Sequence, residues 1–186
     1  DTVYASLENE SERTITVFGQ QFVPDSNRTR ALLPVVFCRE CGQDYYCVRE
    51  RHESSGKPVY EWRDIGDRLD DEESAPGFLY ASTDEPWPTD LENILERVPE
   101  DWIEEKKGQR RIKSGQKENL PRAVRVNATA VAADDGRAMH FVPAPFRFCL
   151  RCEVAYGGRQ SSDFAQLGSL GSEGRSTATT VLSLST

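Results

Sequence analysis

Two Cys-x-x-Cys pairs are the residues of this chain whose types and spacing could do chemistry. The first pair is Cys38 and Cys41, and the second pair is Cys149 and Cys152. Zinc binds thiolates in tetrahedral sites, and four protein ligands leave no open position for a substrate. The two pairs therefore predict one structural zinc ion that joins two distant parts of the chain.

The alternative roles for these cysteines are a redox-active dithiol and ordinary core residues. A thioredoxin-like dithiol needs one Cys-x-x-Cys pair at the start of a helix in a strand–helix–strand pattern, which is absent here. The fifth cysteine, Cys47, lies in an alternating segment and is predicted to be a small core residue. His52 and His140 lack the spacing of metal ligands, so we expect surface or core positions for both.

The sequence lacks the residue patterns of several enzyme classes. It has no glycine-rich phosphate loop followed by Lys and Ser or Thr, and it has no His-Glu-x-x-His motif. Acidic residues are numerous, but in a chain with 31 Asp and Glu residues they usually belong to solvated faces. We therefore assign no catalytic residue.

Basic residues in two places are candidates for contacts with nucleic-acid phosphates. One group flanks the cysteines and the other forms a basic stretch; together they are Arg39, Arg147, Arg151, Lys106, Lys107, Arg110, Arg111 and Lys113. The net charge of −8 argues against a surface that is covered by nucleic acid throughout. The basic stretch also lacks interleaved aromatic residues, so a solvated loop is the competing interpretation for it.

Strands must position the cysteines. Residues 35–37 lead into the first pair and residues 45–48 leave it, which is the strand–turn–strand layout of a zinc-ribbon knuckle. Gly42 permits the tight turn. Alternating apolar residues predict further strands at 14–18, paired in a hairpin with 20–23, and at 59–62, 78–81, 123–127 and 138–142.

Helices and loops are predicted between and after these strands. Apolar residues recur at helical spacing after Asp90, at Leu91, Ile94, Leu95 and Val98. A second short helix is predicted from Pro99, an acidic loop at 64–77 and an exposed basic loop at 106–119. Another short helix is predicted around Phe164, Leu167 and Leu170, and residues 177–186 fit either a helix or a strand.

These elements predict a single α+β domain, mainly antiparallel β, with a four-cysteine zinc ribbon and a few short helices. The ribbon halves are expected at residues 38–63 and 123–158, with residues 64–122 as an insertion between them. The length of 186 residues suits one domain. Because the chain begins at Asp1 and holds a single Met, we expect that it is excised from a larger polypeptide.

Three segments carry a resemblance to a known family: residues 37–45 (Phe-Cys-Arg-Glu-Cys-Gly-Gln-Asp-Tyr), 146–152 (Phe-Arg-Phe-Cys-Leu-Arg-Cys) and 172–182. Together they resemble the cysteine-bearing insertion of large bacterial DEAD/DEAH-box helicases of superfamily two. Residues 97–102 (Arg-Val-Pro-Glu-Asp-Trp) are similar to the same family. In that family the insertion lies between the motifs of the two RecA-like motor lobes.

The resemblance implies a zinc-stabilised accessory domain of an ATP-dependent DNA helicase, without catalysis of its own. It implies that Cys38, Cys41, Cys149 and Cys152 are the zinc ligands. The implied partners are DNA and the remaining helicase lobes, and ATP and magnesium would bind only elsewhere in the parent chain. The alternatives are a protein–protein docking module that uses its acidic surfaces and a redox-active dithiol protein.

The sequence also predicts a cytoplasmic protein with no membrane partner. No apolar run approaches the roughly 18 residues that a membrane-spanning helix requires. Five cysteines, four of them in paired spacing, are more typical of a metal site in a reducing compartment than of a secreted disulfide framework.

Overall fold

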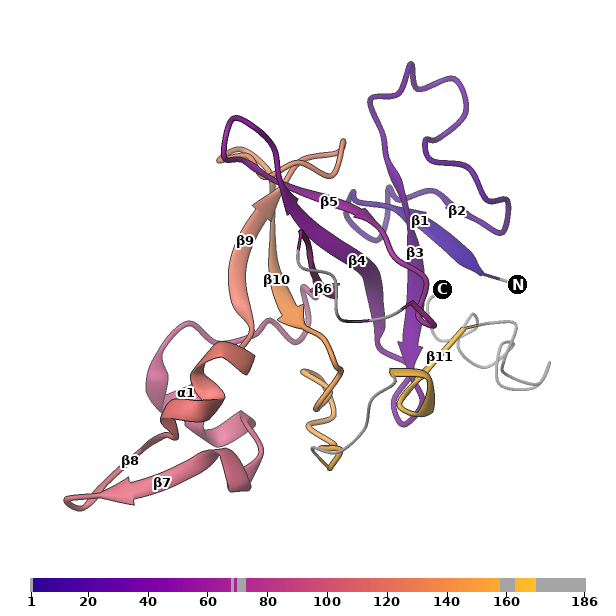
Figure 1. Ribbon diagram of the computed structural model, residues 1–186. Helices are drawn as coiled ribbons and strands as arrows, with labels where there is room; N and C mark the ends of the chain where they lie inside the picture. Colours follow the sequence, from indigo (N-terminus) through magenta and orange to yellow (C-terminus); the bar gives the residue numbers. More distant parts are fainter. Residues whose placement is uncertain (1, 68, 70–72, 158–162, 170–186) are drawn as a thin grey trace.

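An antiparallel sheet organises the chain in the computed structural model, which describes residues 2–67, 69, 73–157 and 163–169 (Figure 1). The strand order is β2-β1-β3-β4-β6-β10-β9, with β5 added beside β4 and β11 beside β3. The bounds are β1 (Val3–Ser6), β2 (Ile15–Thr16), β3 (Leu32–Cys38), β4 (Asp44–His52), β5 (Pro58–Trp62), β6 (Ala75–Tyr80), β9 (Arg122–Val126), β10 (Arg137–Pro143) and β11 (Leu167–Gly168). The predicted α+β class, mainly antiparallel β, is confirmed.

The sheet divides at β4, because two strands share one of its edges. β3 pairs with the start of β4, where Phe37 lies opposite Asp44, and β5 pairs with its end, where Val48 lies opposite Trp62. The far edge of β3 is shared in the same way by β1 and β11. The strands predicted at 35–37, 45–48, 59–62, 78–81, 123–127 and 138–142 are all present, most of them longer than predicted.

Both faces of the central strands are buried. Side chains alternate across a strand, so Tyr45 and Cys47 face one hydrophobic cluster while Tyr46 and Val48 face another. The first cluster also holds Cys38 and Cys149, together with large aromatic residues. The cysteine pairs are therefore built into one of the two cores of the domain.

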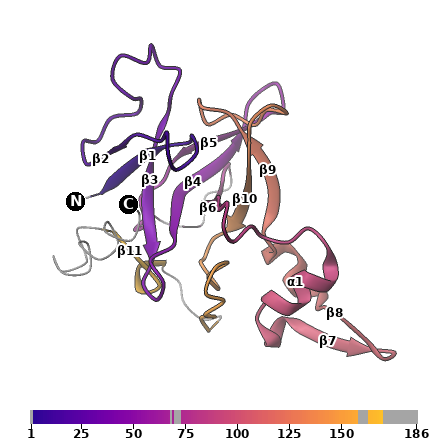
Figure 2. The same ribbon diagram turned by 180° about the vertical axis from the view of Figure 1, so that it is seen from behind.

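Residues 91–119, which we call the arm, project from the end of the sheet near β9 and β10 (Figure 2). The arm comprises α1 (Leu91–Arg97), the 3-10 helix η1 (Glu100–Trp102), β7 (Ile103–Lys106), β8 (Gln109–Ile112) and the 3-10 helix η2 (Ser114–Asn119). Asp90 caps α1, accepting a hydrogen bond from the Asn93 backbone N–H at 2.9 Å, as predicted. No helix in the described part of the chain is long and apolar enough to span a membrane.

The prediction of a loop at 106–119 is wrong in part, because β7 and β8 form a hairpin there. Lys107 and Gly108 both have positive φ angles, 55° and 73°, and supply the two-residue turn. The hairpin pairs Glu104 with Arg111 across its strands. Its exposed strands carry charges rather than alternating apolar residues, so the usual signal of a strand is missing from the sequence.

The predicted hairpin of residues 14–18 with 20–23 is wrong. Only Ile15 and Thr16 are in a strand, and they pair with β1 instead. Phe22 forms a single bridge with Ala31. Val17 and Phe18, which suggested a strand, are exposed, so no packing extends the strand through them.

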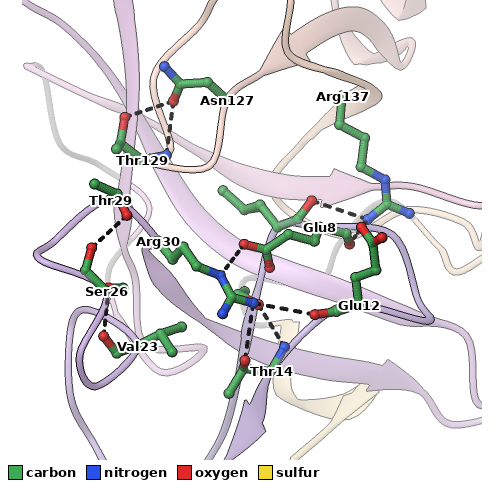
Figure 3. A network of polar contacts seen from close by, with 12 residues as sticks. Glu8, Glu12, Thr14, Val23, Ser26, Thr29, Arg30, Asn127, Thr129 and Arg137 are labelled. Atoms are coloured by element: carbon green, nitrogen blue, oxygen red, sulfur yellow. Dashed lines mark hydrogen bonds and ion pairs between the residues drawn. The ribbon is translucent and has the colours of Figure 1, made fainter.

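Arginine side chains hold the long N-terminal loops in place (Figure 3). Arg30 donates to a carboxylate oxygen of Glu8 at 2.6 Å, to the Glu12 carbonyl at 3.3 Å and to the Thr14 hydroxyl at 3.2 Å. Arg137, from β10, donates to the Glu8 carbonyl at 2.6 Å. These contacts replace the strand pairing that the sequence had suggested for this region.

The helix predicted around Phe164 is a 3-10 turn, η3 (Asp163–Ala165), after which the chain becomes β11. Leu167 lies in β11 opposite Cys38, and its side chain is fully buried. The helical prediction for Leu167 is therefore wrong, because pairing with β3 decides its conformation. Leu170 and residues 177–186 lie outside the described residues.

Candidate metal centre

The first cysteine pair forms a tight turn between β3 and β4. The Gly42 N–H donates to the Cys38 carbonyl at 2.9 Å, and the Cys38 N–H donates to the Gln43 carbonyl at 2.8 Å. Gly42 has a φ angle of 76°, a conformation that glycine adopts without a steric penalty. The predicted knuckle between two strands is confirmed.

The second cysteine pair forms an equivalent turn after β10. The Glu153 N–H donates to the Cys149 carbonyl at 2.9 Å, and the Cys149 N–H donates to the Val154 carbonyl at 3.0 Å. Glu153 has a φ angle of 63° and occupies the position that Gly42 occupies in the first knuckle. The two knuckles therefore present their sulfur atoms in the same way.

The structure brings the four predicted cysteines together. The sulfur of Cys38 lies 3.9 Å from that of Cys152, and the sulfur of Cys41 lies 3.7 Å from that of Cys149. All four sulfur atoms lie within 4.8 Å of one another. Four sulfurs bound at about 2.3 Å to one zinc ion would lie about 3.8 Å apart in a regular tetrahedron. The spacing fits a single tetrahedral ion and is far longer than a disulfide bond of about 2.05 Å.

The electrostatics of the cluster also favour a cation. Interaction with the Cys149 and Cys41 sulfurs lowers the pKa of Cys38 to about 2, while interaction with the Cys38 and Cys41 sulfurs raises the pKa of Cys149 far above its ordinary range. Without a cation, the crowded sulfurs therefore favour a thiolate at Cys38 and keep protons on Cys41 and Cys149. A metal ion would displace these protons, so its binding should release them.

Burial of the ligands is uneven. The sulfur-bearing residues Cys38 and Cys149 are almost completely buried, whereas Cys41 and Cys152 are half-buried. The Arg39 N–H donates to the Gln166 carbonyl at 3.2 Å, so the segment before β11 closes over the first knuckle. Four ligands enclosed in this way suit a structural ion rather than a catalytic one.

The other candidate ligands stand apart from this cluster. Cys47 is completely buried in the core, and burial raises the pKa of its thiol to about 12. His52 is exposed, and its Nδ1 lies 3.2 Å from the Gly56 carbonyl. His140 is half-buried. None of the three belongs to the potential metal-binding group found among the described residues.

The arginines beside the knuckles contact neighbouring protein groups. Arg39 donates to the Phe164 carbonyl at 3.2 Å. Arg147 donates to the Pro145 carbonyl at 3.1 Å, and Arg151 donates to the Gln43 side chain at 3.4 Å. These contacts attach the arginines to the two knuckles and to the segment that covers them.

The basic stretch of the arm is largely neutralised by acidic residues. Arg110 forms ion pairs with Glu96 at 3.6 Å and Glu100 at 3.5 Å, and Arg111 pairs with Glu104 at 2.7 Å. Lys113 donates to the Asp101 carbonyl at 2.6 Å. Within the described parts of the chain, Lys106, Lys107 and Lys113 have no carboxylate partner. The cationic surface of the basic stretch is thus reduced to three lysines.

The arm is anchored on the second knuckle, a contact that sequence reasoning missed. The Arg97 guanidinium, at the end of α1, donates to the Leu150 carbonyl inside the knuckle and pairs with Glu153 at 3.1 Å. It also stacks on Trp87 at 5.1 Å. No sequence signal marks this contact, because a basic residue in the last helical turn is common for local reasons.

Aromatic residues extend the same anchor. Trp102 of the arm packs edge-on against Phe148, with 5.2 Å between ring centroids, and Trp87 packs against the same ring at 5.6 Å. Phe148 immediately precedes Cys149. A structural change at the second knuckle should therefore alter the environment of Trp87 and Trp102, two of the three tryptophans of the chain.

Replacing Arg97 by alanine should loosen the arm without removing a metal ligand. The variant loses a charged hydrogen bond, an ion pair and a cation–π contact, so we expect a loss of about 2 kcal/mol in the free energy of unfolding. Amide exchange over residues 91–112 should accelerate while exchange in β4 stays unchanged. Arg51→Ala is the matched control, because its pair with Glu61 is exposed and contributes little. Equal exchange in the two variants would contradict the anchor.

Comparisons of the chain with protein-family models, with curated proteins and with solved structures found no match in any of the three. The assignment of the site therefore depends on its own geometry. That geometry shows four cysteines placed to hold one metal ion, and the chemistry of four thiolates is what selects among metals.

Proposed function

We propose that the chain binds one zinc ion through Cys38, Cys41, Cys149 and Cys152, and that the ion is structural. The observation that carries this proposal is the set of sulfur–sulfur distances, which match a tetrahedral four-thiolate site. The ion joins the turn between β3 and β4 to the knuckle on which the arm is anchored. Its role is to fix the arm relative to the sheet.

Zinc content measured on the purified chain tests this proposal. We expect one zinc per chain by elemental analysis and by native mass spectrometry. Four thiolates also suit iron, so the protein should be purified from medium that contains both metals. A metal-free protein with a reactive Cys38–Cys41 dithiol would overturn the proposal and favour the redox alternative.

We further propose that this domain is an accessory region of an ATP-dependent DNA helicase of superfamily two. The support is the resemblance of residues 37–45 and 146–152, which are the segments that form the two knuckles. In such a helicase the ATP-binding and magnesium-binding residues belong to the motor lobes. The domain itself would position the arm against the lobes or the DNA.

DNA binding at two salt concentrations tests the nucleic-acid part of this proposal. The groups available for phosphate contact are Lys106, Lys107 and Lys113 on the arm and the arginines beside the knuckles. We expect weak binding that falls steeply between about 50 and 200 mM salt, because counterion release dominates such contacts. Binding that is absent or insensitive to salt would remove DNA from the list of partners.

The double variant Lys106→Ala/Lys107→Ala locates the contact. It should weaken binding and reduce the slope of log K against log salt by about 1.8 for duplex DNA, because each phosphate contact contributes about 0.9. Lys57→Ala is a suitable control, because this exposed lysine lies in the turn between β4 and β5, outside the arm and both knuckles. An equal effect of both changes would show that binding is not localised on the arm.

A further inference from the structure

The two knuckles share further features beyond their cysteines. A phenylalanine precedes each pair, and a residue with positive φ follows it, Gly42 in one knuckle and Glu153 in the other. The same two backbone hydrogen bonds close both turns. A tyrosine then lies four residues after the second cysteine of each pair, at Tyr45 and Tyr156. The centre thus has approximate twofold symmetry in its sequence as well as in its backbone.

Tyr45 crosses from the first knuckle to a sulfur of the second. Its hydroxyl lies 3.3 Å from the Cys149 sulfur and accepts a hydrogen bond from the Leu150 N–H at 2.9 Å. The side chain is almost completely buried. Because the oxygen already accepts from Leu150, its own hydrogen is free to point at the sulfur. A thiolate at Cys149 has no hydrogen to donate, so the hydroxyl is the donor whenever Cys149 is deprotonated.

Tyr156 occupies the corresponding position in the second knuckle. Its hydroxyl oxygen is buried and has no partner of hydrogen-bond geometry in the described structure. Its side chain packs against the hydrophobic cluster that contains Cys38, the first cysteine of the other knuckle, and burial together with the Cys38 sulfur raises the pKa of Tyr156. A buried hydroxyl without a partner is costly, and a thiolate at this position would supply the missing acceptor.

We propose that Tyr45 and Tyr156 are paired positioning residues of the metal centre, each donating a hydrogen bond to the first thiolate of the opposite knuckle. The inference depends on the proposed zinc site and deepens it. Both donors act on the buried thiolates, Cys149 and Cys38, and reduce their negative charge. Partners of this kind orient metal ligands and raise the affinity for the metal.

The crossed tyrosines also give the four ligands an order of reactivity. Cys38 and Cys149 are buried, whereas Cys41 and Cys152 are half-buried, and in this proposal each buried thiolate also accepts a hydrogen bond from a hydroxyl. An alkylating reagent should therefore modify Cys41 and Cys152 first in the zinc-bound protein. In variants that lack the two tyrosine hydroxyls, burial alone would make Cys38 and Cys149 less reactive than Cys41 and Cys152.

Tyr45→Phe and Tyr156→Phe test the proposal, with Tyr46→Phe as the matched control. Tyr46 is the neighbouring buried tyrosine, but its hydroxyl donates to the Ser6 carbonyl on the other face of the sheet. Competition with a chelator should show zinc affinity reduced about 10-fold to 100-fold in each of the two variants. In the cobalt-substituted protein, the thiolate-to-metal charge-transfer band should shift in both variants and stay unchanged in the control.

The outcomes separate this inference from the proposed function. If the wild-type chain binds no zinc, the proposed site itself is wrong. If the wild-type chain binds zinc and both variants behave like Tyr46→Phe, the site stands and the positioning role is overturned. An effect of Tyr45→Phe alone would overturn the symmetric pairing. Amide exchange rates in β4 are the control for folding: if they match those of the wild-type protein, the loss of zinc affinity is not caused by unfolding.

Discussion

Replacing Cys149 by serine is expected to abolish stoichiometric zinc binding and to lower the free energy of unfolding by more than 3 kcal/mol. The sulfur of Cys149 lies 3.7 Å from that of Cys41 at the centre of the cluster, and the residue is completely buried. Serine supplies a poor ligand and leaves a polar hydroxyl in the core. Structural zinc contributes apparent binding free energies of about 10–16 kcal/mol in small domains, so a large share of the stability is at stake.

Two measurements check this expectation. Elemental analysis gives the zinc content, and urea unfolding followed by tryptophan fluorescence gives the stability, because Trp87 and Trp102 pack against Phe148 beside the site. Cys47→Ala is the matched control: it also removes a buried sulfur, but it should retain one zinc per chain. A Cys149→Ser variant with full zinc content and an unchanged unfolding midpoint would show that the four cysteines are not one site.

Breaking the buried ion pair of Arg63 and Asp163 is expected to have the second large effect. Both side chains are fully buried, with the guanidinium 3.4 Å from the carboxylate. Arg63 also donates to the Val48 and Gly77 carbonyls, both at the centre of the sheet. The pair attaches the segment before β11 to the sheet, and that segment covers the first knuckle.

Single substitutions of this pair should cost more than the double substitution. Arg63→Met or Asp163→Asn leaves a buried charge without its partner, which typically costs about 3–5 kcal/mol. The double variant removes both charges, so its cost should be smaller than the sum of the two single costs. Urea unfolding of the four proteins in a double-mutant cycle measures the difference. Additive costs would mean that the two charges do not stabilise each other.

The four cysteines, the aromatic cluster and the arm form one connected unit in this structure. The first hydrophobic cluster contains Cys38 and Cys149 together with Trp102 and Ile112 from the arm. A ligand that binds only the folded state stabilises everything that must be ordered for it to bind. Chelation should therefore loosen the arm and the second knuckle before it affects β1 or β2.

The sequence predicted the strands around the cysteines from their apolar residues and from the turn signals beside them. Residues 45–48 form a continuous apolar run that is buried on both faces, and residues 138–142 contain an exposed Ala138 beside the buried Met139 and Phe141. The hairpin of β7 and β8 was missed because charged pairs such as Glu104 and Arg111 hold it together. The β-branched residues at 14–18 predicted a longer strand than the structure contains. The strand is short because Val17 and Phe18 are exposed and pack against nothing that would extend it.

The four candidate ligands could be predicted from the sequence, because the spacing within each Cys-x-x-Cys pair and the turn residue after it are local properties of the chain. The sequence also shows that the glycine-rich phosphate loop and the His-Glu-x-x-His motif are absent from it. Three features follow from the tertiary structure alone: the four sulfurs meet at tetrahedral spacing, Tyr45 reaches the Cys149 sulfur of the other knuckle, and glutamates pair with the arginines of the arm. These contacts join residues far apart in the chain, and they depend on strand register and core packing, which no local pattern encodes.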